Sequence, residues 1–314
     1  MRASYVKIIV KYDLKEGTMH TERANAKINA YLNIQSRRED GYHNIVSVMQ
    51  TISLCDLVTV DFHPALQSHI TLSVSGNDKV PADCRNLAWR AAERFLQHTH
   101  LSGTVQIMVQ KHIPMAAGLA GGSADAAAVL RALNCLCKEP LSKAELCQIG
   151  LTLGADVPFC ICGGTMLSTG VGEKMERIAT MPTCTLVVAV GEEGVSTPQA
   201  YAALDEKYGF FAQPKAENAD VNELIDLWQN DALSASCACF YNIFEDVIAE
   251  QNSDVDTIKR LMRESGAMRA MMSGSGPAVF GIFEAQFEAE EACATLQQNG
   301  FKAFVCHSSG QYLD

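Results

Sequence analysis

The stretch IPMAAGLAGGSADAAAVLRALN, residues 113–134, joins a loop of small residues to an alanine-rich helix. Three glycines, Gly118, Gly121 and Gly122, fall within this loop, although glycine loses more backbone freedom on folding than any other residue. Ser123 is a typical N-cap residue, and the apolar residues after it keep the helical period. The stretch therefore predicts a strand, a glycine loop and a helix N-terminus, with the backbone left bare for the close approach of another group.

A bare helix N-terminus is suited to binding an anion. Its first amide N–H groups lack partners within the helix, the macrodipole is positive there, and glycine lets the backbone approach a phosphate. A loop that serves packing alone remains an alternative, because glycine also occurs in turns for structural reasons. Two familiar nucleotide motifs are excluded: the loop has no G-K-[ST] ending, and no G-x-G-x-x-G stands at the spacing of a dinucleotide fold.

The hydrophobic pattern on either side of this loop predicts the fold class. Alternation and helical spacing in the first half predict strands at 27–34, 57–62, 69–75 and 104–110 and a helix at 86–99. In the second half they predict strands at 185–191, 277–283 and 302–306 and helices at 255–266 and 288–300, with the polar stretch 205–222 as a surface connection. We therefore expect an α+β protein of two sandwiches.

We expect the domains to span residues 26–180 and 181–314. Residues 1–25 are expected to be either a floppy extension or the result of a start site assigned too far upstream, with Met19 as the true start. The charged segment near the N-terminus fits neither a signal peptide nor a transit peptide.

Composition narrows the class of partner. The 314 residues carry a net charge of −11, and a basic face is the usual footprint of a protein that binds nucleic acid or an anionic membrane, so neither is expected as a partner. Twelve cysteines include three C-x-C pairs without the spacing of a zinc site, so metal binding by them is the less favoured interpretation. A reducing cytoplasm is the expected compartment.

Two further segments have a related character. MMSGSGPAVF (271–280) is a second small-residue loop that leads into a strand. GADVPFCICGG (154–164) sets a single carboxylate, Asp156, at a turn before a proline and an apolar run. Such an acid either caps a helix or is functional, and capping is the favoured interpretation of this segment taken alone.

Taken together with AKIN (26–29), these segments resemble the GHMP kinase superfamily. PMAAGLAGGSADAAAVL resembles its phosphate loop and SGSGP its C-terminal glycine motif. The segments 26–56, 150–159, 168–176 and 196–205 resemble the members that phosphorylate a cytidine-diphosphate methylerythritol. The resemblance implies a ribosomal-S5-domain-2-like N-terminal sandwich and a ferredoxin-like C-terminal domain. It also implies an ATP-dependent kinase of isoprenoid synthesis by the non-mevalonate route. We expect this kinase to be a monomer or a weak homodimer.

The resemblance also implies the catalytic and nucleotide contacts. Asp156 would take or orient the proton of the acceptor hydroxyl, and Lys27 would be its partner. ATP, with Mg²⁺, would lie over Pro114, Met115, Ala116, Ala117, Gly118, Leu119, Ala120, Gly121, Gly122, Ser123 and Ala124, with Gly274 and Ser275 close by. Asn86, Leu87 and Lys111 resemble the adenosine-side contacts, although Lys111 could equally be a solvated loop lysine. Ala124 replaces a serine that is usual in the family, so a hydroxyl contact to the metal would come from Ser123 or from water.

For the substrate, the resemblance implies that Tyr42 and Tyr201 stack on cytosine while His43 hydrogen-bonds the base. Asn29 would hold the erythritol portion, and Thr197 would support the same end. Stacking tolerates any base, so hydrogen bonds would have to select cytosine. Two alternatives remain: another small-molecule kinase of the superfamily, and a relative that binds ATP without catalysis.

Overall fold

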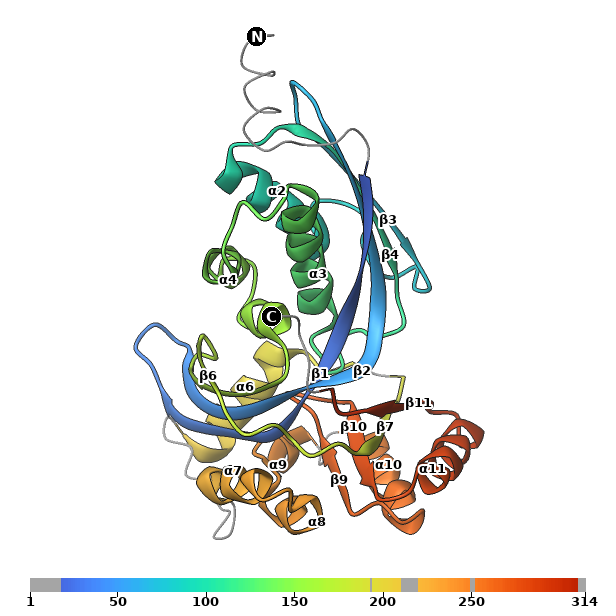
Figure 1. Ribbon diagram of the computed structural model, residues 1–314. Coiled ribbons are helices and arrows are strands. Elements are labelled where there is room, and N and C mark those ends of the chain that lie inside the picture. The colour runs from blue at the N-terminus through green and yellow to red at the C-terminus, as the bar shows by residue number, and fades with distance from the viewer. Residues whose placement is uncertain (1–17, 193, 210–219, 249–251, 310–314) are drawn as a thin grey trace. The chain divides into compact units, whose positions relative to one another are not determined.

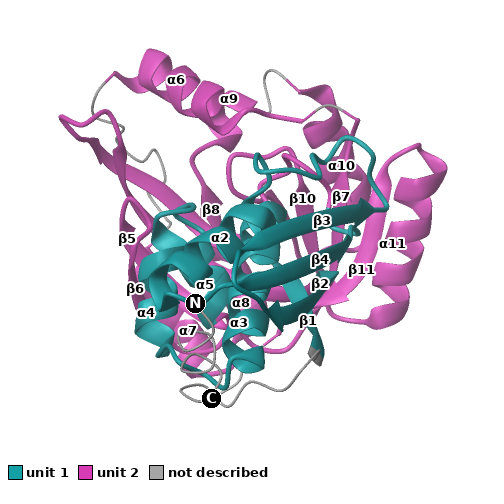
Figure 2. Cartoon of the chain, turned by 90° about the horizontal axis from the view of Figure 1, so that it is seen from above, with its two compact units in different colours: residues 1–26, 55–113, 121–162 teal, residues 27–54, 114–120, 163–314 magenta. Residues whose placement is uncertain are grey.

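The computed structural model describes residues 18–192, 194–209, 220–248 and 252–309 (Figure 1). The chain forms two compact units (Figure 2): unit 1 comprises residues 1–26, 55–113 and 121–162, and unit 2 comprises residues 27–54, 114–120 and 163–314. Two long strands, β1 (Thr18–Arg37) and β2 (His43–Pro64), contribute residues to both units. The predicted N-terminal extension is wrong for residues 18–25, which belong to β1, while residues 1–17 lie outside the described part.

In unit 1 the strands lie in the order β3-β4-β2-β1, with β3 at His69–Ser75 and β4 at Gly103–Gln110. β4 is antiparallel to β2 and parallel to β3. Parallel strands need a crossover connection, and α2 (Leu87–Thr99) supplies it between β3 and β4. The strands predicted at 57–62, 69–75 and 104–110 and the helix predicted at 86–99 are confirmed.

Helices cover one face of this sheet (Figure 2). They are α2, α3 (Gly121–Leu136), α4 (Lys143–Leu151) and α5 (Val157–Cys162). The alternating burial along β4 follows from this arrangement, because every second side chain faces the helices. Every residue of α3 from Ala124 to Leu130 is buried, so the middle of this helix lies inside its unit.

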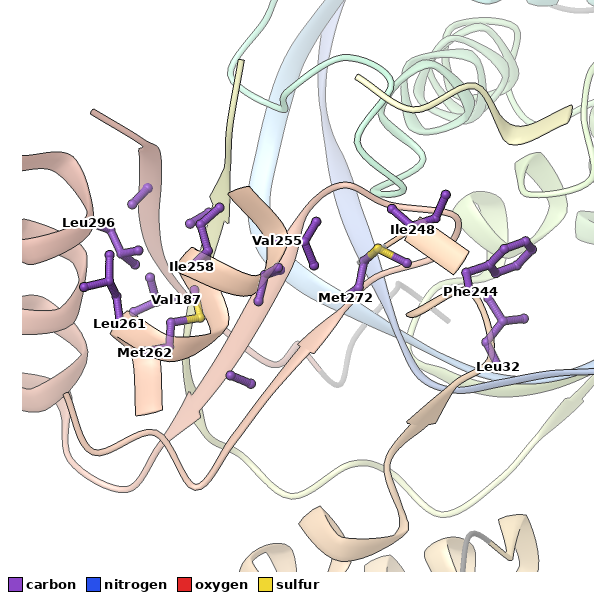
Figure 3. Close-up of a cluster of buried hydrophobic side chains, with 14 of the residues drawn as sticks. Leu32, Val187, Phe244, Ile248, Val255, Ile258, Leu261, Met262, Met272 and Leu296 are labelled. Atoms are coloured by element: carbon purple, nitrogen blue, oxygen red, sulfur yellow. The ribbon is translucent and has the colours of Figure 1, made fainter. Parts of the chain in front are cut away.

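Unit 2 contains a four-stranded antiparallel sheet in the order β11-β7-β10-β9. Its strands are β7 (Thr185–Val190), β9 (Arg269–Met272), β10 (Val279–Phe283) and β11 (Lys302–His307), and its helices are α10 (Ser253–Glu264) and α11 (Gln286–Gln298). The chain order β7-α10-β9-β10-α11-β11 is the ferredoxin-like arrangement that the resemblance implies. Figure 3 shows the buried cluster between the helices and the sheet, where Ile258 and Met262 of α10 lie near Val187 of β7.

The remaining elements of unit 2 attach to β1 and β2. β5 (Thr165–Gly170) pairs with the first part of β2, β6 (Lys174–Arg177) pairs with β5, and β8 (Tyr241–Asn242) is parallel to β1. The other helices are α6 (Thr197–Tyr208), α7 (Val221–Gln229), α8 (Leu233–Ser236), the 3₁₀ turn η1 (Cys237–Cys239) and α9 (Glu245–Ile248). No helix within the described ranges combines the length and apolar character that crossing a bilayer requires.

Two local predictions are wrong. Ser123 is not an N-cap but the third residue of α3, because Ala120 adopts a left-handed φ of 58° and turns the chain into the helix at Gly121. The stretch 205–222 is not wholly a connection, since α6 continues to Tyr208 and α7 begins at Val221; residues 210–219 lie outside the described part. The domain boundary near residue 180 stays a prediction.

Candidate active site

The loop before α3 packs directly on the second glycine loop of unit 2. A Cβ placed on Gly118, whose φ is 78°, would lie 2.0 Å from the carbonyl oxygen of Ser273. Ser273 Oγ donates to the Gly118 carbonyl at 3.1 Å, and the amide of Ala278 donates to the Ala117 carbonyl at 3.1 Å. The predicted neighbours Gly118 and Gly274 therefore lie together, and no residue larger than glycine fits at position 118.

Lys27 lies beside these loops, on β1. Its amide donates to the Leu119 carbonyl at 3.1 Å, and a Cβ on Gly274 would lie 3.2 Å from its Nζ. The side chain is only 4% exposed, and its ammonium donates to Asn29 Oδ1 at 2.5 Å. Among the described residues of unit 2, no carboxylate forms an ion pair with this ammonium. A buried charge with a neutral partner is costly, so the arrangement favours an additional anion at Nζ.

Asn29 is fixed in turn by the neighbouring strand. Its Nδ2 donates to Ser47 Oγ at 2.7 Å, and that hydroxyl donates to the Tyr31 carbonyl at 2.9 Å. Lys27, Asn29 and Tyr31 alternate along β1 and so share one face, as the sequence pattern predicted for the first two. Since Asn29 Oδ1 accepts from Lys27, this chain of hydrogen bonds sets the position of the lysine head.

The N-terminus of α3 belongs to unit 1. A Cβ on Gly121 would lie 3.0 Å from Ile113 Cγ2 and 3.5 Å from Lys111 Nζ, whereas Gly122 is exposed. Ser123 is partly exposed, and Ala124 is fully buried. The first amides of the helix, from Gly121 onward, have no acceptor within the helix, so an anion can bind there.

Two of the residues predicted to contact adenosine have structural partners. Asn86 is the N-cap of α2: its Oδ1 accepts from the Ala88 amide at 2.9 Å, and its Nδ2 donates to the Pro81 carbonyl at 2.8 Å. The interpretation of Lys111 as a solvated lysine is wrong, because it is buried and paired with Asp56 and Asp125. Nucleotide contacts of Asn86, Leu87 and Lys111 stay predictions.

Asp156 lies on the turn between α4 and α5, directly before the first residue of α5. Its carbonyl accepts from the Cys160 amide at 3.0 Å, as in the first turn of a helix, and its side chain belongs to a partly exposed residue. The turn lies beside the start of α3, since a Cβ on Gly154 would lie 3.9 Å from Ser123 Oγ. Unit 1 thus brings the predicted acid and the predicted phosphate-binding helix into one neighbourhood.

The residues predicted to bind the base gather in unit 2. The rings of His43 and Tyr201 stack with centroids 4.7 Å apart and an interplanar angle of 25°. His43 Nε2 lies 2.7 Å from Asp205 Oδ1, and Arg37 Nη1 lies 3.2 Å from Asp205 Oδ2. Tyr42, next to His43, is exposed.

Asp205 and Arg37 belong to this cluster but were not predicted from the sequence. The available signal was that Asp205 follows Tyr201 by four residues and so lies on the same face of α6. In the same helix, Thr197 Oγ1 lies 2.9 Å from Ser275 Oγ. Thr197, predicted to support the substrate, is therefore hydrogen-bonded to Ser275, predicted to lie near the nucleotide.

Comparison with known proteins finds one family match in each half of the chain. A family described as GHMP kinases N terminal domain matches residues 86–164, and one described as GHMP kinases C terminal matches residues 219–310. The 4-diphosphocytidyl-2-C-methyl-D-erythritol kinase of Exiguobacterium sibiricum is 39% identical over 282 residues, which are 90% of this chain and 93% of that protein.

Solved structures agree in fold. A crystal structure of 4-(cytidine 5'-diphospho)-2C-methyl-D-erythritol kinase is similar with a TM-score of 0.76 and 30% identity, covering 93% of this chain and all of that one. The mevalonate kinase of L. major has a TM-score of 0.71 over 95% of this chain and 98% of its own, but only 15% identity, so this likeness concerns the fold alone.

Proposed function

We propose a specific activity for this chain, which belongs to the GHMP kinase family and is an ATP-dependent phosphotransferase. It transfers the γ-phosphoryl group of ATP to the 2-hydroxyl of 4-(cytidine 5'-diphospho)-2-C-methyl-D-erythritol, giving the 2-phosphate and ADP. Support comes from the relative of that name, which is 39% identical over nine-tenths of this chain. The cytoplasm remains the predicted compartment, since the cysteines of the described residues are free thiols.

The observation that carries the proposal is the buried ammonium of Lys27 between two glycine loops. Its protein partner is the neutral amide of Asn29, and a Cβ on Gly274 would lie 3.2 Å from this charge and 2.9 Å from the Gly118 carbonyl oxygen, so a bare glycine backbone faces the ammonium. Phosphoryl transfer requires mainly alignment and stabilisation of negative charge on the transferred group. We assign that stabilisation to Lys27, and the binding of the polyphosphate to the amides from Gly118 to Ser123.

We assign the acceptor hydroxyl to Asp156. In the reaction the hydroxyl oxygen forms a bond to the γ-phosphorus, the bond from that phosphorus to the β,γ-bridging oxygen breaks, and the hydroxyl proton passes to the Asp156 carboxylate. A tertiary alcohol is a hindered nucleophile, so a carboxylate that removes or orients its proton is expected to contribute substantially. The position of Asp156 on a partly exposed turn beside Ser123 supports this role.

The donor set suits Mg²⁺ held mainly by the nucleotide. The described residues contain no group of three or more histidine, cysteine or acidic side chains that could form a metal site of their own. Mg²⁺ commonly keeps several waters and binds through substrate phosphates with few protein ligands. The Ser123 hydroxyl is the side chain we assign to it, and the ion would neutralise charge on the β- and γ-phosphates when bound.

A panel of acceptors tests the proposal. Release of ADP is measured with cytidine-diphosphate methylerythritol, mevalonate and homoserine at equal concentrations. We expect turnover with the first and background rates with the other two. Turnover of mevalonate or homoserine instead would assign the chain to another branch of the family. Binding of ATP without turnover of any acceptor would identify a non-catalytic relative.

A further inference from the structure

A pair of thiols lies between α4 and α5 of unit 1. Cys147 Sγ, on α4, is 3.5 Å from the Sγ of Cys162, the last residue of α5, and 3.9 Å from the Pro158 carbonyl oxygen. Both cysteines are free thiols and both are partly exposed, so a small molecule can reach the sulfur atoms. The two sulfur atoms are in van der Waals contact. A disulfide bond of about 2.05 Å requires them to approach by about 1.5 Å.

The chain between these two cysteines contains Asp156, on the turn that connects α4 to α5. A bond between the two sulfur atoms would close residues 147–162 into a loop. The turn would then be held at both of its ends by helices that are covalently joined. Such a bridge would therefore act on the segment to which we assign the acceptor hydroxyl.

Packing limits how the two helices can adjust to such a bond. A Cβ on Gly150 of α4 would lie 2.9 Å from Val157 Cγ1 and 2.9 Å from Ile161 Cδ1 of α5, so the helices are already in close contact there. The helices cannot approach as a whole. Instead α5, which has six residues, must turn about this contact to bring the two sulfur atoms together. Asp156 directly precedes α5 and moves with it.

We propose that Cys147 and Cys162 form a redox modification site, which a low-molecular-weight disulfide converts into an intramolecular disulfide that displaces Asp156 and slows phosphoryl transfer. The bridge itself is independent of the proposed function, and only its effect on turnover rests on that function. In a reducing compartment, disulfides are typically transient and serve catalysis or redox sensing. The site therefore needs a bond that forms and is reduced again, rather than a permanent one.

The reaction is a thiol–disulfide exchange in two steps. One sulfur of the pair, as a thiolate, attacks a sulfur of the small disulfide, whose S–S bond breaks and releases one small thiolate. The other sulfur of the pair loses its proton and attacks the protein sulfur of the mixed disulfide, which releases the second small thiolate. The two protein thiols are oxidised to a disulfide, and the small disulfide is reduced to two thiols that take up the two protons. An excess of small thiol reverses both steps.

The contact between the two thiols makes this exchange slow. The hydrogen bond with Cys162 raises the pKa of Cys147, and burial and the charge of a Cys162 thiolate raise it further, whereas Lys143 acts to lower it. Because the thiolate is the attacking form, the pair reacts slowly at neutral pH. The test for the bridge must therefore run until the thiol content no longer changes.

Mass spectrometry tests for the bridge without any substrate. The protein is incubated with excess oxidised glutathione, alkylated under denaturing conditions and digested with trypsin, which releases residues 144–174 as one peptide with three cysteines. We expect this peptide to carry a single alkyl group, on Cys160, and to carry three when dithiothreitol precedes alkylation. Three alkyl groups without dithiothreitol, glutathione attached without a bridge, or a bridge that includes Cys160 would each overturn the proposal.

Two serine variants serve as test and control. Cys147→Ser removes one sulfur of the pair and should leave Cys160 and Cys162 unbridged. Cys84→Ser removes an exposed thiol elsewhere in unit 1 and should bridge like the unmodified protein. Loss of the bridge in Cys84→Ser would mean that the oxidation proceeds through a different pair of thiols.

Turnover is measured on the same samples, as release of ADP with the cytidine substrate. A small displacement of a reacting group is costly, so we expect the bridge to lower kcat by about tenfold or more, with the KM for ATP nearly unchanged. Dithiothreitol should restore kcat, and Cys147→Ser should keep its kcat after the same treatment with oxidised glutathione. A bridged protein with full kcat would refute the effect on Asp156. A protein that forms the bridge but turns over no acceptor, even when reduced, would instead refute the proposed function and leave the modification site supported.

Discussion

Lys111 donates to Asp125 Oδ2 at 2.7 Å inside unit 1, where both side chains are almost fully buried, and the same ammonium contacts Asp56. Two carboxylates therefore share one positive charge. Asp56 Oδ1 also accepts from the amides of His112 and Ile113, whereas Asp125 Oδ1 is buried with no partner among the described residues. The excess negative charge consequently falls on Asp125, which lies in α3 close to its N-terminus.

Burial favours the neutral form of both groups, so it acts to raise the pKa of Asp125 and to lower the pKa of Lys111. It raises the pKa of Asp125 to about 7, since the attraction of Lys111 does not outweigh burial together with the repulsion from Asp56. For Lys111 burial acts to lower the pKa, but the attraction of the two carboxylates is stronger and the pKa is raised. Lys111 thus stays charged, and Asp125 is the member of this cluster that titrates near neutral pH.

We predict that Asp125→Asn removes a pH dependence of stability. With a folded-state pKa of about 7 and an ordinary value of 3.8, the folded protein binds more protons than the unfolded chain between these pH values. Stability from this group is therefore present at low pH and is lost as the pH rises to about 7. As the pH rises through this range, the unfolding free energy of Asp125→Asn should increase relative to that of the unmodified protein, by at most about 1.4 kcal/mol per pH unit.

Urea unfolding at several pH values between 4.5 and 8 measures this difference. Asn134→Ala is the control on the same helix: it removes buried hydrogen bonds to Leu141 but no ionisable group, so its loss of stability should not vary with pH. Parallel stability curves for Asp125→Asn and the unmodified protein would show that Asp125 stays ionised throughout.

Gly118→Ala should weaken nucleotide binding by more than backbone strain alone would explain. A left-handed φ costs alanine roughly 1–2 kcal/mol. In Gly118→Ala the new Cβ would also lie 2.0 Å from the Ser273 carbonyl oxygen, so one of the two loops must move. Gly41 has a similar φ of 87° with nothing within 4 Å of its Cβ position, which makes Gly41→Ala the matched control.

We expect both glycine variants to lose about 1–2 kcal/mol of unfolding free energy from strain. Gly118→Ala should lose more, and it alone should raise the KM for ATP, by about tenfold or more. Thermal unfolding and ATP-dependent kinetics give the two readouts. Equal behaviour of the two variants would mean that the contact with Ser273 does not constrain the loop.

The sequence predicted those features that depend on neighbours along the chain. Alternation along β1 put Lys27 and Asn29 on one face, and the structure confirms it. The start of α3 was misplaced because a left-handed Ala120 leaves no signal in the sequence. Contacts between distant segments were equally inaccessible: nothing in the sequence near Lys111 indicates that Asp56, 55 residues earlier, lies against it.

Asp156→Asn separates the catalytic and capping interpretations of this residue. Asparagine caps a helix about as well as aspartate, so the start of α5 should be preserved while the carboxylate is lost. We expect kcat to fall by about 100-fold to 10,000-fold with the KM for ATP nearly unchanged. Asp220→Asn, at the N-cap of α7, is the control and should keep its activity. Retention of most activity in Asp156→Asn would leave this residue with a capping role only.

Tyr42→Ala tests the position of the base. Tyr42 is 66% exposed, so its removal should cost little stability, and any kinetic effect then reports on the substrate. Loss of one stacking partner is worth about 1–3 kcal/mol, which predicts a rise in the KM for the cytidine substrate of roughly 5-fold to 150-fold with the KM for ATP unchanged. Phe287, at 63% exposure on α11, is the matched aromatic, and Phe287→Ala should change neither constant. A selective rise in the KM for ATP would assign Tyr42 to the nucleotide, because a stacking residue affects the ligand whose ring it covers.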